Sequence, residues 1–317
     1  MLIIDPQTET ADTTSISGLP HGTATVTNKW RGFAFAPSVG KLFAAPFNAD
    51  SVLIIDPATN RTDTLAVSGG AAMAGKWAGI AYAPVSGKLF AAPARETAVL
   101  IIDPEARTAD ATTMVVSGAD PSVTLKWFGI VYAPSTEKLY AVPMRAGEIL
   151  IVDPVANTTD TTAMAGFDTA IYKWSSVAYA PSTGKLYAAP LNTDAVLIVD
   201  PATNATDITT MAGLGQGEWK YDSIAFSPST GLLYAPPRDE ASVLLIDPWA
   251  NTTDGNAMAG LVGSSQWDGI AVSPFSNKLF ATPNKHGSVL VISHTASVEA
   301  CAANNPCART CINDTRG

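Results

Sequence analysis

Five lysines and a glutamine occupy one recurring position of the sequence, directly before an aromatic residue: Lys29, Lys76, Lys126, Lys173, Lys220 and Gln266. If these side chains ring the mouth of a channel, their ammonium groups would focus positive potential and attract an anionic ligand. The alternative is structural: each lysine stem packs along an aromatic ring, and its ammonium group pairs with a carboxylate of the neighbouring repeat. Recurrence in every repeat favours the structural interpretation, since a ligand site usually needs asymmetry.

Asymmetry occurs two residues further on, between the aromatic residue and a small residue. The six repeats carry Arg31, Ala78, Phe128, Ser175, Asp222 and Asp268 at this position. We expect it to face the channel or the adjoining repeat. Two carboxylates and an arginine would hold a polar ligand or a cation, or would form a buried ion cluster between repeats. Both interpretations stay open.

Other catalytic patterns are scarce. The three histidines, His21, His286 and His294, have no paired spacing that suggests a metal site, and no nucleophile-elbow motif occurs. An aspartate precedes proline at Asp5, Asp56, Asp103, Asp153, Asp200 and Asp247. Such a carboxylate accepts backbone N–H groups of its own turn. We therefore expect no cofactor, with calcium at these turns as the alternative.

These positions belong to a sequence repeat that occurs six times in the chain. Copies of YAPSTGKLYAAP begin at residues 35, 82, 132, 179, 226 and 272. The anchor aromatic residues recur at spacings of 47, 50, 47, 47 and 46 residues, at Trp30, Trp77, Trp127, Trp174, Tyr221 and Trp267. A period of 40 to 50 residues with several strands per unit is typical of a β-propeller.

Each unit contains four short strands, as in GIAYA, KLYAA, VLIID and TDTT, joined by turns rich in Pro, Ser, Thr and Asn. The sequence therefore predicts an all-β, six-bladed β-propeller of four-stranded blades. Strands of the VLIID type number seven, because MLIID opens the chain. We expect the N-terminal segment 10–16 to supply the outer strand of the last blade, with a partial seventh blade as the alternative.

The predicted propeller spans residues 1–296, and a cysteine-containing tail spans 297–317. The three cysteines, Cys301, Cys307 and Cys311, all lie in this tail. They indicate either the start of a disulfide-rich module in an oxidising compartment or three free thiols.

The net charge of −9 disfavours nucleic-acid binding. No apolar run is long enough for a membrane span, and the opening MLIIDP resembles a repeat strand rather than a signal peptide.

The loops divide into two classes. Turns between strands one and two, and between strands three and four, are nearly invariant, whereas the other loops vary in sequence and length. We call the loops between strands two and three, together with the inter-blade loops, the variable-loop face. Divergence confined to one face is typical of a binding surface, although unconstrained drift would look the same. Glycosylation sequons occur at Asn60, Asn157, Asn204, Asn251 and Asn313.

The order GIAYAPSTGKLYAAP, then VLIIDPATNTTDTT, resembles the YVTN-type propeller repeats of surface-layer and secreted proteins over about 290 residues. The chain departs from that pattern in its Lys-Trp pair and in Ala-Ala-Pro. The resemblance implies a propeller that serves as a recognition scaffold, and it implies no activity.

The sequence thus predicts a non-enzymatic recognition or assembly propeller, extracellular or on the cell surface, that binds a protein or glycan through the variable-loop face. One alternative is a metal-assisted hydrolase or lyase with Asp222 and Asp268 in its channel. Another is a structural module of a larger cell-wall or appendage protein.

Overall fold

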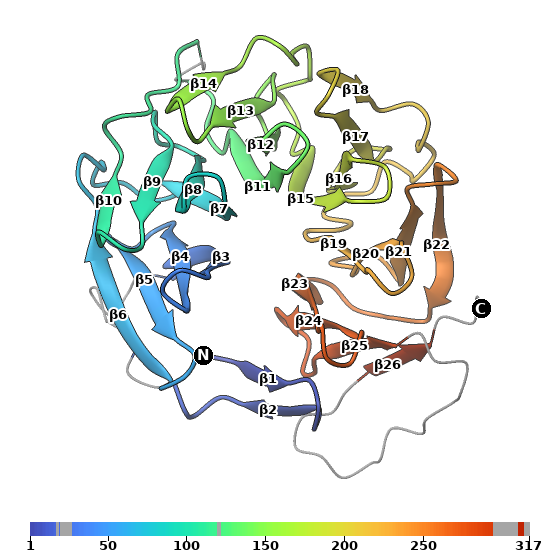
Figure 1. Cartoon of the computed structure of the whole chain (residues 1–317). Coiled ribbons are helices and arrows are strands. Elements are labelled where there is room, and N and C mark those ends of the chain that lie inside the picture. The colour runs from blue at the N-terminus through green and yellow to red at the C-terminus, as the bar shows by residue number, and fades with distance from the viewer. Residues whose placement is uncertain (17–18, 20–26, 119–121, 294–309, 314–317) are drawn as a thin grey trace. The chain divides into compact units, whose positions relative to one another are not determined.

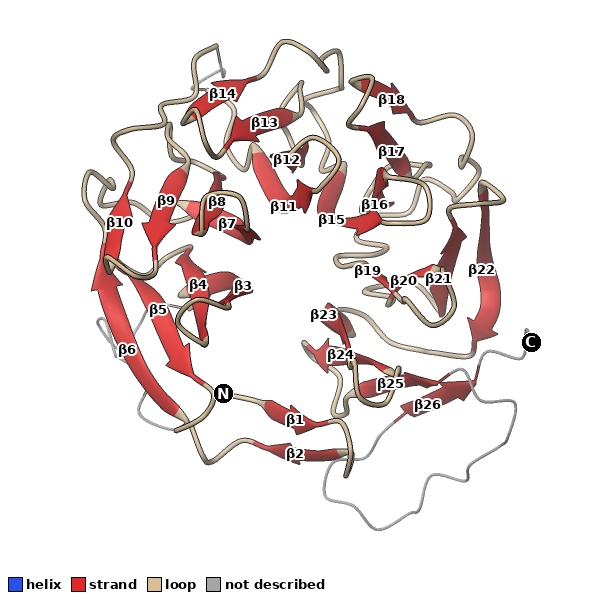
Figure 2. Ribbon diagram, in the orientation of Figure 1, coloured by secondary structure: helices blue, strands red, loops and turns tan. Residues whose placement is uncertain are grey.

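The protein is a six-bladed β-propeller, as the sequence predicts. The computed structural model describes residues 1–16, 19, 27–118, 122–293 and 310–313. The described residues form strands, turns and loops without an α-helix, arranged as six four-stranded sheets and one two-stranded sheet (Figures 1 and 2). No helix within these ranges is long and apolar enough to cross a membrane.

The chain divides into two compact units. The first contains Met1 and residues 13–175 and 201–205, and the second contains residues 2–12, 176–200 and 206–317. Three blades lie in the first unit. Blade 1 comprises β3 (Trp30–Ala36), β4 (Lys41–Pro46), β5 (Ser51–Asp56) and β6 (Arg61–Ala66). Blade 2 comprises β7 (Trp77–Ala83), β8 (Lys88–Pro93), β9 (Leu100–Asp103) and β10 (Thr108–Asp110). Blade 3 comprises β11 (Trp127–Ala133), β12 (Lys138–Pro143), β13 (Leu150–Asp153) and β14 (Thr158–Asp160).

The strands of blade 4 are divided between the units, with Trp174, Ser175 and Ala205 in the first and the remaining strand residues in the second. Blade 4 comprises β15 (Trp174–Ala180), β16 (Lys185–Pro190), β17 (Leu197–Asp200) and β18 (Ala205–Asp207). Blade 5 comprises β19 (Ala225–Phe226), β20 (Leu233–Ala235), β21 (Ser242–Asp247) and β22 (Thr252–Ala259). Blade 6 comprises β23 (Trp267–Val272), β24 (Leu279–Pro283), β25 (Leu290–Ser293) and β26 (Thr310–Asn313). A separate pair consists of β1 (Ile3–Asp5) and β2 (Thr10–Asp12).

The first strand of most blades contains a bulge at the Trp-x-Gly motif. In blade 2 the register with β8 shifts between Trp77 and Ile80. Blade 3 shows the same shift, and blades 1 and 6 show a register shift within the same motif. Gly79 lies inside this bulge, and a Cβ there would meet the backbone oxygen of Phe128 on the next blade at 2.2 Å. Only glycine permits this close approach of two inner strands. The bulge interrupts the regular hydrogen-bonded pairing of strands one and two at the residue after the tryptophan.

Blades pack through alternating faces of their strands. In the first unit, Phe43, Val52 and Ile54 of blade 1 contact Ile80, Leu100 and Ile102 of blade 2. The same arrangement recurs between blades 2 and 3 and between blades 5 and 6. The VLIID strand is therefore buried on both faces, which explains its continuous apolar run.

The closure of the last blade differs from our expectation. Within the part of the chain that the structure describes, segment 10–16 does not supply the outer strand of blade 6, because β2 pairs only with β1. The fourth strand of that sheet is β26, from the predicted tail, and it runs parallel to β25. The physical reason is that β1 and β2 already form a complete antiparallel hairpin of their own. Leu2 and Ile4, at the start of this hairpin, pack against Phe280, Val289 and Val291 of blade 6.

Candidate functional site

The recurring lysines before the aromatic anchors are buried. Lys76, Lys126, Lys173 and Lys220 are at most 3% exposed, Gln266 is 1% exposed, and Lys29 is half-buried. Burial lowers the pKa of Lys76, Lys173 and Lys220, because desolvation penalises the charged form, and the pKa of Lys173 falls to about 8.

Their terminal groups donate mainly to backbone carbonyl oxygens of the variable-loop face. Lys76 Nζ lies 3.0 Å from Met73 O, and Lys126 Nζ lies 3.3 Å from Arg95 O. Lys220 Nζ donates to Gly215 O at 2.6 Å and to Thr193 O, and Lys173 Nζ donates to Asp168 O. Gln266 Nε2 donates to Glu240 O at 2.8 Å. This geometry fits the structural interpretation, except that carbonyl groups replace most of the expected carboxylates.

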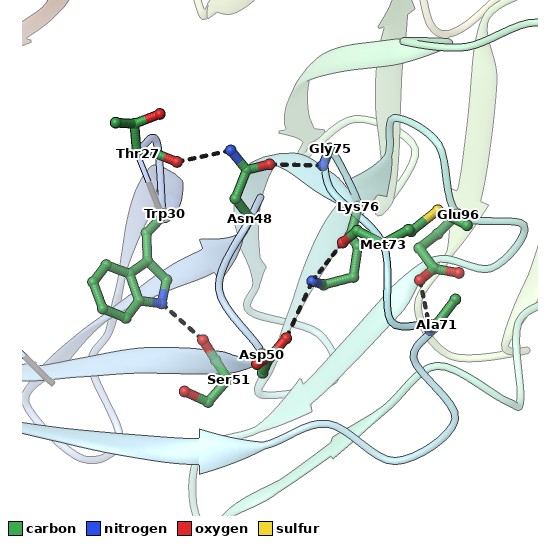
Figure 3. A network of polar contacts seen from close by, with 10 residues as sticks. All are labelled: Thr27, Trp30, Asn48, Asp50, Ser51, Ala71, Met73, Gly75, Lys76 and Glu96. Atoms are coloured by element: carbon green, nitrogen blue, oxygen red, sulfur yellow. Dashed lines mark hydrogen bonds and ion pairs between the residues drawn. The ribbon is translucent and has the colours of Figure 1, made fainter. Parts of the chain in front are cut away.

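The loops of blades 1 and 2 show how such a lysine is held (Figure 3). The Asn48 side chain joins two loops, because its amide group donates to Thr27 O and its oxygen accepts from Gly75 N, both at 2.8 Å. Lys76 also forms a 3.9 Å ion pair with the exposed Asp50, and Glu96 accepts a hydrogen bond from Ala71 N. The network orders the loop backbone and leaves the loop tips free to vary.

The residue before the lysine or glutamine often has a left-handed backbone. Asn28, Gly75, Leu125, Trp219 and Ser265 have φ between 50° and 75°. This conformation suits glycine or asparagine and is strained for leucine and tryptophan. In Trp219 the strained backbone is secured by a 2.9 Å hydrogen bond from its N–H to Asn192 Oδ1.

Trp219 belongs to a polar cluster that distinguishes blade 5 from the other blades. The guanidinium carbon of Arg238 lies 4.4 Å from the centroid of the Trp219 ring, within the range of a cation–π contact. On the same guanidinium, Nη1 lies 3.5 Å from Oδ2 of Asp222, whose residue is 4% exposed. Two elements of the variable-loop face therefore meet here: the loop that leads into blade 5 and the loop between its second and third strands.

Two further polar atoms of the cluster are buried. Arg238 Nε and Ser223 Oγ have no hydrogen-bond partner among the described protein atoms. Buried polar atoms are normally satisfied, so these two atoms indicate a hydrogen-bond partner that the described protein atoms do not supply. Around this cluster the inner strand is short, because β19 covers only Ala225–Phe226 and Tyr221 meets Pro237 through an isolated bridge. We define the blade 5 cluster as Trp219, Asp222, Ser223 and Arg238.

The structure gives different surroundings to the other members of the predicted ligand-binding set. Asp268 is exposed, whereas Asp222 is buried, although both occupy the same repeat position. Arg31 lies in the first unit with its guanidinium 4.7 Å from the centroid of the Phe128 ring. The sequence therefore identified Asp222 but not its partner, since Arg238 lies sixteen positions away in a variable loop. The sequence offered one signal for this cluster, because blade 5 carries Tyr221 and Ser223 where most other repeats carry Trp and Gly.

The predicted turn roles are confirmed at several positions. Asp56 Oδ1 accepts hydrogen bonds from Ala58 N and Thr59 N, and Asp103, Asp153, Asp247 and Asp5 do the same in their turns. Asn60, Asn157, Asn204 and Asn251 all have φ of 55°, which explains their recurrence as backbone requirements. Glycosylation at these asparagines and at Asn313 stays a prediction.

Histidine and cysteine add no metal site within the described ranges, where no group of three or more His, Cys, Asp or Glu side chains could hold an ion. His286 packs against Trp267 with ring centroids 4.5 Å apart. His21, His294, Cys301 and Cys307 lie outside the described residues, and Cys311 lies in β26, whose side chains are not described.

Comparison with known proteins supports the fold. No protein-family model matches the chain, and no curated protein matches its sequence. A putative 6-phosphogluconolactonase from Bacteroides uniformis has 16% identity and a TM-score of 0.67, over 93% of this chain and 87% of that one. Virginiamycin B lyase from Staphylococcus aureus has 9% identity and a TM-score of 0.64, over 84% and 81%. A chain of a nidogen/laminin complex has 14% identity and a TM-score of 0.50, over 71% and 78%. The β-propeller fold is thus shared with lyases, lactonases and binding proteins.

Proposed function

We propose that this protein is a recognition propeller that binds a partner protein through the variable-loop face, with the blade 5 cluster as its anchor. The observation that carries the proposal is the constrained guanidinium of Arg238. Its face is covered by Trp219, one Nη is paired with buried Asp222, and Nε is left without a protein partner.

Such a constrained arginine loses little side-chain entropy when it binds, because Trp219 and Asp222 already hold it in place. Tryptophan and arginine are also the residue types that most often dominate the binding energy of protein interfaces. The strained backbone of Trp219 supports the same role, since backbone strain persists mainly where surrounding structure and function require it.

The partner group is a carbonyl or carboxylate oxygen. Arg238 Nε offers an N–H donor, and the Ser223 hydroxyl can donate or accept a hydrogen bond. Because Asp222 balances the charge of Arg238, the blade 5 cluster favours a hydrogen-bond acceptor over a group with a full negative charge. The similarity to a chain of a nidogen/laminin complex is compatible with protein binding at this fold. We therefore propose a protein rather than a glycan partner.

Affinity capture from the culture medium of the source organism tests this proposal. The bait is the full chain, compared with Arg238→Lys, Trp219→Ala and the control Arg107→Ala. Arg107 is an exposed arginine in the turn between strands three and four of blade 2, where it pairs with Asp63. We expect a protein that the wild type and R107A retain, and that R238K and W219A lose by about tenfold, a loss of about 1.4 kcal/mol. Circular dichroism of each variant shows whether the fold is intact. Retention of the same proteins by all four baits would reject the proposal.

The metal-assisted hydrolase or lyase is the second candidate, since a lyase and a putative lactonase share the fold. In blade 5, the Arg238 guanidinium occupies one oxygen of Asp222 and reduces its attraction for a cation. Metal analysis of the purified chain distinguishes the candidates. A stoichiometric ion that Asp222→Asn and Asp268→Asn each remove would favour the enzyme.

We propose an extracellular or cell-surface location and membership of the YVTN-type repeats. We also propose a boundary near residue 296 between the propeller and a tail module with disulfide candidates, with β26 of that tail added to the blade 6 sheet. Lys29, Arg31 and Asp268 stay predicted ligand contacts, and so do the buried Lys76, Lys126, Lys173, Lys220 and Gln266. Mass spectrometry of the secreted protein, before and after thiol alkylation and glycosidase treatment, tests the location, the disulfides and the sequons together.

A further inference from the structure

The β1–β2 hairpin reproduces the outer half of a blade. Its register joins Ile3 to Asp12, Ile4 to Ala11 and Asp5 to Thr10. In blade 2, β9 and β10 pair in the same way, with Ile101 joined to Asp110, Ile102 to Ala109 and Asp103 to Thr108. Glu9 has the left-handed φ of 53° that Arg107 has in the equivalent turn, at 54°. The hairpin therefore corresponds to strands three and four of the repeat, and we call it the half-blade.

The half-blade also packs as the outer strands of a blade do. Leu2 and Ile4 contact Phe280, Val289 and Val291 of blade 6. Their repeat equivalents Leu100 and Ile102 contact the corresponding residues Phe43, Val52 and Ile54 of blade 1. The established interface between successive blades thus continues from blade 6 onto the half-blade.

The inner half of this blade has no counterpart among the described residues. Every complete blade pairs strand three with a strand two of the KLYAA type, as Leu89, Phe90 and Ala91 pair with Ile102, Ile101 and Leu100. In the two-stranded sheet, β1 pairs only with β2 (Figure 1). The sequence contains six KLYAA-type segments, and each one belongs to blades 1 to 6.

The uncovered edge leaves apolar side chains accessible. Leu2, Ile3 and Ile4 are only half-buried, whereas their blade 2 equivalents are at most 7% exposed. On the inner strands of blade 6, Ala271 and Thr282 are exposed, although the residues equivalent to Thr282 in the other blades are buried. An open strand edge beside apolar surface is a template for pairing with another strand.

Blade 1 also has apolar side chains that are more exposed than their equivalents in other blades. Phe33 is 52% exposed, while its equivalents Ile80, Ile130, Val177 and Ile224 are at most 9% exposed. Leu42 is half-buried, while the equivalent leucine of every other blade is fully buried. In blades 2 and 3 this face is covered by the inner strands of the preceding blade.

A charged residue at the open edge of β1 indicates which kind of strand would pair with it. In blades 1, 2 and 3 the lysine that starts strand two pairs with the aspartate that ends strand three, as in Lys88 and Asp103 at 3.6 Å. Asp5 is the equivalent aspartate of the half-blade, and it is exposed. An incoming strand that begins with lysine would complete this pair.

We propose that the open edge of β1 binds a β-hairpin of a partner polypeptide, whose second strand has the pattern Lys-Leu-aromatic-Ala-Ala. Its leucine lies beside Ile4 on the side that faces blade 6, its aromatic residue lies opposite Ile3, and its lysine pairs with Asp5. Backbone hydrogen bonds along β1 supply affinity, and the alternating side chains supply specificity, as in other cases of strand addition. This assembly role is separate from the blade 5 cluster and does not depend on it.

The test uses the full chain and a synthetic peptide with the sequence of residues 174–190, the inner hairpin of blade 4. We expect binding, measured by anisotropy of the labelled peptide, together with slower hydrogen exchange in residues 2–12. Asp5→Lys, or a Lys185→Glu change in the peptide, should weaken binding by about tenfold through like-charge repulsion, and the two changes together should restore it. A Leu186→Asp peptide is the matched control for the apolar contact and should not bind.

An isolated hairpin is marginally stable in water, so a second variant carries the peptide covalently. Residues 174–196 are fused directly before Leu2, which reproduces the natural connection between strands two and three. We expect a higher melting temperature and protected amides at Ile3, Ile4 and Asp5. A fusion without either effect overturns the proposal. A dimer of the unmodified chain that Asp5→Lys dissociates would assign the edge to a second copy and would also overturn it.

Discussion

Lys278 Nζ lies 2.7 Å from Glu9 Oε1, and this ion pair connects blade 6 to the half-blade. In blades 1, 2 and 3 the equivalent lysine pairs with an aspartate of its own blade. Blade 6 carries Ser293 in place of that aspartate, so Lys278 pairs with the neighbouring hairpin instead. A substitution at one repeat position thus converts a contact within a blade into a contact between blades.

We expect Glu9→Gln to loosen the half-blade locally. The Lys278 and Glu9 side chains are 24% and 15% exposed, so the loss in unfolding free energy should be at most about 1 kcal/mol. Hydrogen exchange in residues 2–12 should accelerate, while exchange in blades 2 and 3 stays unchanged. The double variant Glu9→Lys with Lys278→Glu should recover protection. Equal acceleration throughout the chain would contradict a local role.

The blade 5 cluster predicts unequal effects for its two charged partners. Arg238→Met leaves the buried carboxylate of Asp222 without its cation, and should cost about 3 kcal/mol of unfolding free energy. Adding Asp222→Asn to that variant should recover most of the loss, because it removes the buried charge. Chemical denaturation of the single and double variants measures both steps. Additive losses would show that the two side chains do not interact.

Close approach of the inner strands makes Gly79 irreplaceable. In Gly79→Ala, the new methyl group meets Phe128 O at 2.2 Å, and neither backbone can move without disturbing its own strand. We expect a loss of about 3 kcal/mol in unfolding free energy. Gly255→Ala is the matched control, since no heavy atom lies within 4 Å of its ideal Cβ, and its effect should stay within about 0.5 kcal/mol. Thermal melts that rank the two variants equally would contradict the packing argument.

Burial of Lys173 predicts a particular dependence of stability on pH. Desolvation lowers the pKa of this lysine to about 8, from 10.5 in the unfolded chain. Between these two values the unfolded state binds more protons, so the unfolding free energy should rise as pH increases from about 8 to about 10. Below pH 8 the full cost of the buried charge is present.

Lys173→Met removes this titration. Urea unfolding of both proteins at pH 7.5 and 9.5 should show the wild type gaining stability relative to the variant at the higher pH. Parallel changes in the two proteins would mean that the ammonium group is solvated, contrary to its 2% exposure.

The sequence determined the features that repeat. Six copies of one unit specify four strands, their turns and their apolar faces, because each blade needs only local hydrogen bonds and its neighbours' packing. The aspartate that caps each Asp-Pro turn acts within three residues, so Asp56 and Asp103 were predictable from sequence alone.

Only the tertiary structure decided the features that break the repeat. Segment 10–16 carries the signature of an outer strand, yet its pairing depends on whether β1 or β25 lies beside it, and β1 is linked to it by a short turn. Arg238 pairs with Asp222 because blade 5 brings a loop residue against the start of an inner strand. Both outcomes rest on contacts between residues distant in the repeat pattern, where neither periodicity nor composition specifies a partner.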